Sequence, residues 1–341
     1  MIKKTIFYKT LLNVSVFLIL FCSNMVASQI LGSFGRNMMW VLGLCLLFFV
    51  NKRYNARNII LLLGIAGIRA IIMLFQFNFT PEFLLEFIGF LLTINFLMQV
   101  GQLFTAEEYA KTLVNIMVII CAVSLIGYTI LMSASDEWIL SISQLDGRFN
   151  HNYIYVWGWD NFIFNRNAGP WWEPGAFQCF IAMAMIMIMS GRCDDMKWKR
   201  LKLIILLTAW ITTQSTTGYI IMALIILLMY KTIAEIIFGK KFYEIKSWKI
   251  FLMAVVLVGA VIFFYNTLGG QVIHDKLNMQ HDSTATRYND VISSLNISLE
   301  NPIVGTGHKY TKYYDRYGIG NNSAALLTIP IMHGWIYFIL Y

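Results

Sequence analysis

The stretch NRNAGPWWEPGAF, from Asn165 to Phe177, joins a polar loop to a long apolar run. Pro170 and Pro174 fix φ, and the glycine beside each proline allows a tight turn. Trp171 and Trp172 favour the headgroup level of a bilayer, because each ring is apolar and carries one polar N–H group. The stretch therefore predicts a rigid turn at a membrane boundary, followed by a transmembrane helix.

Glu173 lies inside this stretch and has two interpretations. A carboxylate that is held rigid and half-buried at a membrane boundary is a usable acid or base. Alternatively, Glu173 only marks the start of a helix, with Pro174 in the first turn and the carboxylate near the positive end of the helix dipole. The local sequence favours neither interpretation.

Composition places the chain among polytopic membrane proteins. It is 58% hydrophobic and 13% charged, with a mean hydropathy of +0.63, which exceeds what a soluble core can bury. The net charge of +8 comes from residues in short loops between apolar spans, so it indicates topology and no nucleic-acid partner. The five cysteines show no CxxC or paired-loop pattern, which predicts neither a disulfide nor a metal site.

The fold class predicted is an all-α membrane protein with about ten transmembrane helices in a single polytopic domain, residues 1–341. Apolar spans are expected at 10–31, 37–50, 58–79, 82–100, 112–134, 174–190, 201–213, 218–230, 250–266 and 324–341. The pair 201–213 and 218–230 forms either a hairpin of full helices or a partly re-entrant element.

The basic residues predict which side of the membrane each loop faces. If every span crosses once, 17 Lys and Arg residues fall on one side and eight on the other, so the richer side is cytoplasmic. The long polar loops 135–173 and 267–323 then both face outward. Any chemistry is therefore expected at the outer face.

The second outer loop contains a predicted amphipathic helix at 284–301. Its apolar stripe consists of Tyr288, Val291, Ile292, Leu295 and Leu299, and the pattern stops at Asn301–Pro302. Arg287 precedes the stripe; it either snorkels to lipid headgroups or grips a phosphate with two hydrogen bonds. His308 follows a tight glycine turn and is either a loop residue or a base.

Two further polar groups have a structural and a functional interpretation. Arg69 in mid-span is costly, and an ion pair with Glu86 or Glu82 of the next span is the favoured explanation. The turn QSTTG at 214–218 either satisfies helix ends or presents Ser215, Thr217 and free N–H groups to an anion.

Four features occur in the order found in bacterial O-antigen polymerases, which belong to the O-antigen polymerase and ligase superfamily. They are Arg166 before Glu173-Pro174-Gly175 and Phe177; a span pair with Ser215-Thr216-Thr217-Gly218; Arg287 heading a helix that ends in Asn301-Pro302, Gly305 and Gly307; and Asn322 opening a span with an inner Gly334. The resemblance covers residues 160–341.

The resemblance implies a GT-C-like glycosyltransferase that needs no metal or other cofactor. It would polymerise undecaprenyl-pyrophosphate-linked oligosaccharide repeat units into O-antigen, capsular or exopolysaccharide at the outer face of the cytoplasmic membrane. Such units are both donor and acceptor, and a chain-length regulator and a flippase are implied partners. Glu173 or His308 would be the base, and Arg166 and Arg287 would hold the pyrophosphate. Secondary binding residues would be Arg148, Ser215, Thr217 and Asn322.

Two alternatives remain at this point. Ligases of the superfamily typically carry His immediately before the last Asn, where this chain has Asn321, so the resemblance favours a polymerase over a ligase. A transporter or flippase of lipid-linked oligosaccharide would be expected to show repeated halves and functional groups at the midplane. Only Arg69 and its possible partners suggest the transporter.

Overall fold

The computed structural model describes residues 2–50, 55–76, 81–146, 149–159, 162–163, 165–249, 251, 255, 282–307, 315–316 and 325–340. The chain divides into two compact units. The first comprises Met1–Lys52 and Asn95–Leu257, and the second comprises Arg53–Ile94 and Val258–Tyr341.

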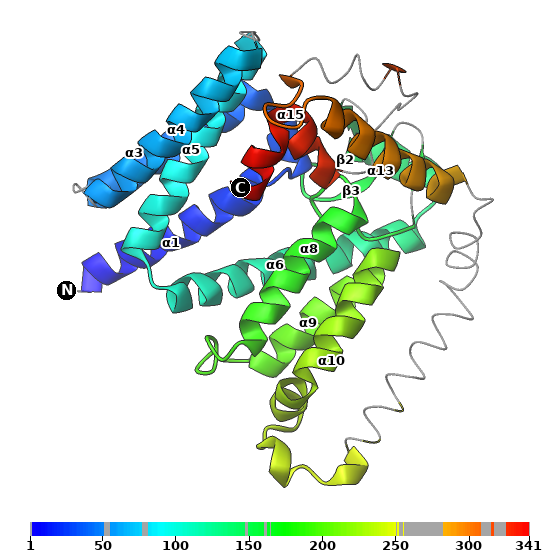
Figure 1. Cartoon of the computed structure of the whole chain (residues 1–341). Helices are drawn as coiled ribbons and strands as arrows, with labels where there is room; N and C mark the ends of the chain where they lie inside the picture. Colours follow the sequence, from blue (N-terminus) through cyan, green and yellow to red (C-terminus); the bar gives the residue numbers. More distant parts are fainter. Residues whose placement is uncertain are drawn as a thin grey trace. The chain divides into compact units, whose positions relative to one another are not determined.

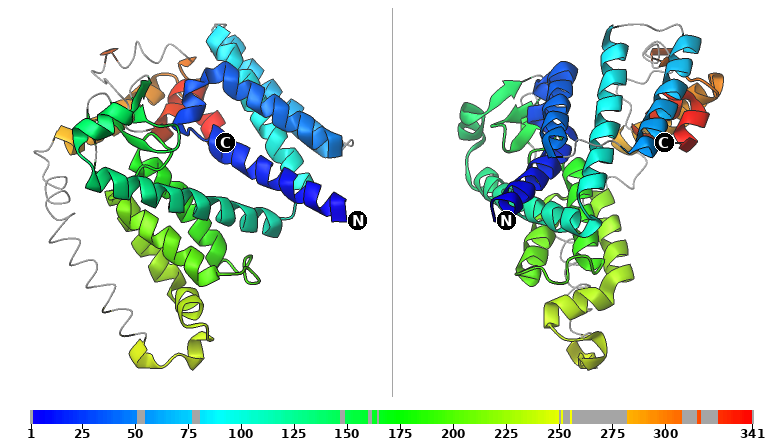
Figure 2. Two further views of the ribbon diagram at one scale, coloured as in Figure 1. Left: turned by 180° about the vertical axis from the view of Figure 1, so that it is seen from behind. Right: turned by 90° about the vertical axis from the view of Figure 1, so that its left-hand side faces the viewer.

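Helices make up most of the first unit (Figure 1). They are α1 (Ile2–Cys22), α2 (Val26–Ile30), α3 (Gly32–Val50), the second half of α5 (Pro81–Leu103), α6 (Ala106–Ser133), α7 (Asp136–Ile142), α8 (Pro174–Met189), α9 (Lys199–Thr212) and α10 (Thr216–Phe238), with a 3-10 turn η1 at Phe242–Glu244. Helix α6 packs against α1, α8 and α9. Figure 2 shows α8, α9 and α10 side by side from two further directions.

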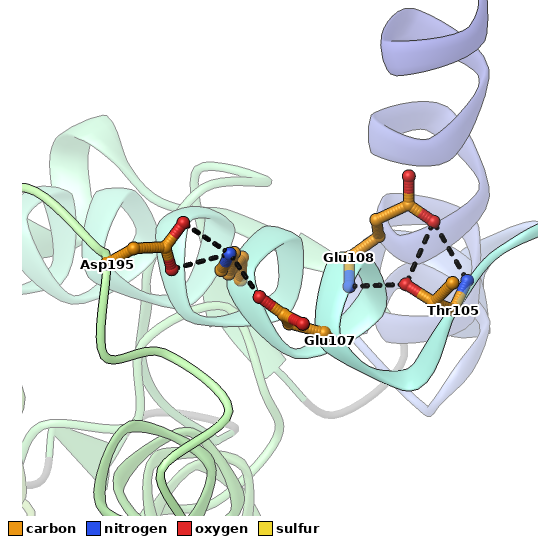
Figure 3. Close-up of polar contacts among 5 residues, drawn as sticks. Thr105, Glu107, Glu108 and Asp195 are labelled. Atoms are coloured by element: carbon orange, nitrogen blue, oxygen red, sulfur yellow. Dashed lines mark hydrogen bonds and ion pairs between the residues drawn. The ribbon is translucent and has the colours of Figure 1, made fainter.

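A capping box starts α6 (Figure 3). The Thr105 hydroxyl oxygen accepts a hydrogen bond from the Glu108 amide at 3.2 Å, and the Glu108 carboxylate accepts one from the Thr105 amide at 2.9 Å. One turn later, Lys111 donates to Glu107 at 2.6 Å and to Asp195 of the α8–α9 loop at 2.7 Å. These contacts join the start of α6 to the loop between α8 and α9.

The loop after α6 contains a small sheet that the all-α prediction missed. Four short antiparallel strands, β1 (Gln144–Asp146), β2 (Phe149–His151), β3 (Val156–Trp159) and β4 (Phe162–Ile163), pair in sequence order. They are too short to show a clear two-residue alternation. Tyr155 beside β3 packs on α6 where Gly127 leaves room, since a Cβ there would lie 2.5 Å from the Tyr155 ring.

The second unit contains α4 (Ala56–Gln76), the first half of α5, α13 (Asp282–Glu300) and α15 (Ala325–Leu340). Helices α13 and α15 pack against each other. Helix α15 is broken at Gly334, whose φ of 82° lies outside the helical region. The inner glycine expected in this span is therefore the point where the helix changes course.

Ten membrane-crossing helices are not confirmed. Among the described residues, five helices are long and apolar enough to cross a membrane, within α3, α4, α5, α6 and α10. Shorter apolar helices occupy 6–22, 174–189 and 326–339, while the span expected at 250–266 lies almost wholly outside the described residues. Helix α9 has 14 residues, about 21 Å at 1.5 Å per residue, which is less than the ~30 Å hydrocarbon core.

Candidate functional site

Asn167 fixes the start of the proline-rich turn. Its side chain is fully buried and donates to the Thr212 hydroxyl at the end of α9, at 2.8 Å, and to the Ser124 hydroxyl of α6, at 3.2 Å. Its amide oxygen accepts a hydrogen bond from the Gly169 N–H at 3.0 Å. Asn167 thus ties the loop to two helices, and a buried amide with this many partners is rigid.

Trp171 holds the middle of the turn, and its side chain lies inside the protein. Its side chain is fully buried, and its ring stacks on Phe177 and Phe180 with centroid distances of 5.3 and 4.6 Å. Its indole N–H donates to the Ser23 carbonyl at 3.1 Å. The prediction that Trp171 anchors the protein at headgroup level is therefore wrong, because protein groups satisfy both the ring and the N–H.

Glu173 is the N-cap residue of α8, and Pro174 occupies the first turn as expected. Its side chain makes no capping hydrogen bond to that turn. Instead, a carboxylate oxygen lies 3.4 Å from the position a Cβ on Gly175 would take, and the Ser215 hydroxyl lies 4.0 Å from the same point. The Glu173 carboxylate and the Ser215 hydroxyl therefore flank Gly175, where the first turns of α8 and α10 come together.

A close approach of three helices sets the position of α10. A Cβ on Gly218 would lie 1.9 Å from the Gln178 amide oxygen and 3.1 Å from the Trp210 indole nitrogen. Gln178 and Trp210 are buried and hydrogen-bonded to each other at 3.3 Å. The Ser215 hydroxyl caps α10 by accepting from the Gly218 amide at 3.4 Å. The glycine of the QSTTG motif is thus required by packing.

Arg166 is half-buried and lies within electrostatic range of the Tyr219 hydroxyl in the first turns of α10. Tyr219 itself donates to the Ile211 carbonyl at 2.9 Å. Next to it, Gln214 adopts a left-handed conformation with φ of 47° and donates to the Tyr128 hydroxyl at 3.1 Å. A non-glycine residue in this region carries strain, which the surrounding contacts must hold.

In the second unit, the glycine turn expected after Pro302 closes on the break in α15. A Cβ on Gly305 would lie 2.5 Å from the His333 backbone nitrogen, and one on Gly334 would lie 2.0 Å from the Ile303 carbonyl oxygen. The Thr306 amide donates to Ile331 at 2.7 Å, and the Trp335 amide donates to Pro302 at 2.7 Å. The loop thus accepts and donates the backbone hydrogen bonds that the broken helix cannot make internally.

Gln76 joins this arrangement from α4 and was missed by sequence reasoning. Its side-chain nitrogen donates to the carbonyl of Met332 at 2.7 Å and to that of Val304. Only the polar character of position 76 among apolar neighbours hinted at a buried partner.

Arg69 is buried between aromatic rings. Its guanidinium carbon lies 5.1 Å from the Tyr337 ring centroid and 5.8 Å from that of Phe90. Glu86 lies within electrostatic range of Arg69. The expected carboxylate neighbour is thus joined by a cation–π contact that the sequence analysis did not predict.

The predicted site residues divide between the two units. Glu173, Ser215 and Arg166 surround the start of α10 in the first unit, and Thr217 is exposed in the first turn of that helix. In the second unit, the backbone of Arg287 lies in α13. His308, Arg148 and Asn322 lie outside the described residues.

The far ends of the same helices in the first unit carry charged groups. Lys111 meets Asp195 near the start of α6, and Lys202 near the start of α9 donates to Asn115 at 2.6 Å. The helices therefore have one end with paired charges and another with the buried polar loop around Asn167. Within the described part of the chain, no group of three His, Cys, Asp or Glu side chains is arranged to hold a metal ion.

Comparison with known families gives a match over part of the chain. Residues 201–333 match the family model described as O-antigen ligase. Over these residues, which are fewer than half of the chain, the sequence is similar to the O-antigen ligase family. The match runs from α9 to His333 in α15, so it includes Ser215, Gly218 and the Gly305 turn.

The O-antigen ligase match confirms the resemblance to the O-antigen polymerase and ligase superfamily. With the apolar helices described above, it indicates a multi-pass membrane protein. Members of the matched family are glycosyltransferase-like enzymes of membrane polysaccharide biosynthesis. No curated protein and no solved structure gives a significant match.

Proposed function

We propose that this protein polymerises undecaprenyl-pyrophosphate-linked oligosaccharide repeat units at the outer face of a bacterial cytoplasmic membrane. The observation that supports this most directly is the meeting of the α8 and α10 N-termini. There, the Glu173 carboxylate and the Ser215 hydroxyl lie on either side of Gly175, which has no side chain of its own to separate them. Ser215 and α10 belong to the segment that matches the O-antigen ligase family.

The reaction needs a base and positive charge. A hydroxyl of the incoming repeat unit attacks the anomeric carbon of the donor glycan, and the bond from that carbon to the pyrophosphate oxygen breaks. Glu173 takes the hydroxyl proton, with His308 as the second candidate. The departing undecaprenyl pyrophosphate carries negative charge, which Arg166, Arg287 and the N–H groups at the start of α10 stabilise.

The secondary candidates have simpler roles in this proposal. Thr217, exposed beside the cap of α10, together with Arg148 and Asn322, binds sugar or phosphate oxygens. Aromatic side chains of the two outer loops stack on the sugars. The loops 135–173 and 267–323 both face the periplasm, and a chain-length regulator and a flippase act with the enzyme.

A ligase is the second candidate, because the matching family is described as O-antigen ligase. A ligase moves a finished glycan to another lipid acceptor and leaves its length unchanged. Asn321, where ligases of the superfamily typically have His, favours the polymerase.

Purified protein in liposomes separates these functions when a lipid-linked single repeat unit is the only glycan supplied. A polymerase converts it into a ladder of carrier-linked products that differ by one repeat, and releases undecaprenyl pyrophosphate. The same preparation of Glu173→Gln is the control. If products form only when a lipid A-core acceptor is added, each carrying one unit, the protein is a ligase. Movement of the substrate across the bilayer without new bonds would identify a transporter.

A further inference from the structure

Helix α13 exposes a strip of large apolar side chains. Large apolar side chains on one face are exposed: Tyr288 at 65%, Val291 at 40%, Ile292 at 42% and Leu299 at 63%. We call these four residues the apolar face of α13. The face that packs against the protein includes Asp290, Ser294 and Ser298, all less than 5% exposed. Ile297, on the same face, is also fully buried, so the packed face is largely polar while four apolar side chains are exposed.

A third face of α13 is both polar and exposed. Asn289, Asn296 and Glu300 are exposed, and at 100° per residue they lie roughly 90° around the helix from the apolar face. The Glu300 carboxylate also accepts a hydrogen bond from Arg316 at 3.4 Å. The surface that α13 leaves uncovered is therefore divided into an apolar strip and a polar strip that run along the helix together.

The neighbour of α13 shows what surrounds it. Helix α15, against which α13 packs, is apolar along its length and exposes Leu326 at 66%, Ile336 at 53% and Ile339 at 78%. In a multi-pass membrane protein, such side chains face lipid acyl chains. A helix packed alongside α15 is close to the same lipid. An apolar strip beside a polar strip is the pattern of a helix that lies at the boundary between acyl chains and water.

We propose that the apolar face of α13 contacts the acyl chains of the bilayer, so that this part of the 267–323 segment lies in the membrane surface. The Asn289–Asn296–Glu300 strip faces headgroups and water, and the Asp290–Ser294–Ser298 face packs on the protein. Single exposed apolar residues are common on protein surfaces and need no explanation. Four of them on one strip, next to a lipid-facing helix, indicate contact with lipid.

Spin labels at single cysteines test the proposal in the full-length protein in liposomes. The exposed native cysteines, Cys45 and Cys179, are first replaced by serine. Labels at Ile292 and Leu299 are expected to collide more with oxygen, which concentrates in acyl chains, than with a water-soluble nickel chelate. A label at Asn296, which is also exposed and lies on the same helix, is the matched control and is expected to favour the nickel chelate.

Two results would overturn the proposal. Nickel accessibility at Ile292 and Leu299 equal to that at Asn296 would place the apolar face in water. Low accessibility to both reagents would show that protein, either another part of this chain or a second copy, covers it. Photolabelling of the unmodified protein with a lipid that carries a diazirine in its acyl chain gives an independent reading. It should modify α13 at Tyr288, Ile292 or Leu299, and its absence there contradicts the proposal even if a labelled variant misfolds.

Discussion

The Gln76 side-chain nitrogen lies 2.7 Å from the carbonyl oxygen of Met332, two residues before the break in α15 at Gly334. The same nitrogen also donates a hydrogen bond to the Val304 carbonyl. One side-chain amide therefore links the glycine turn to the broken helix. Replacing Gln76 by Glu keeps the shape but puts an oxygen where both carbonyls need a donor. We expect a loss of about 1–3 kcal/mol in the free energy of unfolding, because buried acceptors lose their partner.

Hydrogen exchange locates this effect. Gln76→Glu should accelerate exchange at the Thr306 and Trp335 amides and leave α8 to α10 unchanged. Gln29→Glu is the matched control, since the Gln29 amide makes an exposed hydrogen bond to Asn24 at 3.3 Å. Equal exchange in wild type and Gln76→Glu would show that the turn does not depend on Gln76.

The variant Glu173→Gln distinguishes the two interpretations of Glu173, a catalytic base or only the first residue of a helix. The Glu173 side chain makes no capping hydrogen bond, so the isosteric amide should change stability by less than about 1 kcal/mol. Because the amide accepts no proton, polymerisation should slow on the order of a hundredfold or more. The carrier-linked ladder measures the rate, and thermal unfolding measures the stability. A normal ladder from Glu173→Gln with none from His308→Gln would assign the base to His308.

Arg287→Lys tests whether the guanidinium plane is used. Lysine keeps the positive charge but loses the fork that engages two phosphate oxygens, so the loss should be tenfold or more, approaching that of Arg287→Ala. The ladder at matched protein levels measures it. Full chain length from Arg287→Lys would mean that charge alone suffices.

Gly218→Ala should destabilise the junction of α8, α9 and α10. The new methyl displaces the Gln178 amide from its bond to Trp210, which should cost about 1–3 kcal/mol. Gly101→Ala is the control, because nothing lies within 4 Å of its Cβ position, and there a gain of roughly 0.5–1 kcal/mol is expected. Thermal unfolding in detergent micelles compares the two, and equal midpoints would contradict the packing argument.

The ion pair of Asp195 predicts a pH effect. The hydrogen bond from Lys111 lowers the pKa of the Asp195 carboxyl below its usual 3.8. Since the folded pKa lies below the unfolded one, the stabilisation is present above 3.8 and is lost as pH falls through the folded value. Asp195→Asn should therefore lower the thermal unfolding midpoint at neutral pH. The difference in midpoint between wild type and variant should disappear in strong acid and become smaller in about 1 M salt. Glu137→Gln, at an exposed position of α7, is the control substitution.

Sequence patterns predicted the elements whose signals are local. Pro174 at the start of α8, the end of α13 at Asn301–Pro302 and Gly334 inside the last span all follow from backbone restrictions that single residues impose. The membrane class followed from composition. These features need no knowledge of distant neighbours.

Long-range partners decided the features that were missed. The tryptophan that looked like a membrane anchor, Trp171, is buried because Ser23, Phe177 and Phe180 are in place to receive it. Gln76 and Asn167 hold loops in place through hydrogen bonds to residues that are distant in sequence, so only the structure identifies this role. The apolar strip that the periodicity of α13 predicted is present. Whether that strip faces the protein or points away from it is set by how α13 packs against α15, which the periodicity does not show.

The turn that carries Glu173 is completed by the beginning of the chain. Trp171 bonds to Ser23, 148 residues earlier, and the Val26 amide donates to the Pro170 carbonyl at 3.0 Å. During synthesis, residues 23–26 therefore leave the ribosome long before their partner and wait while several helices are inserted. Contacts so distant in sequence form late in folding. The turn that carries Glu173 therefore reaches its final packing only after the segment from Ser23 to Trp171 has been made.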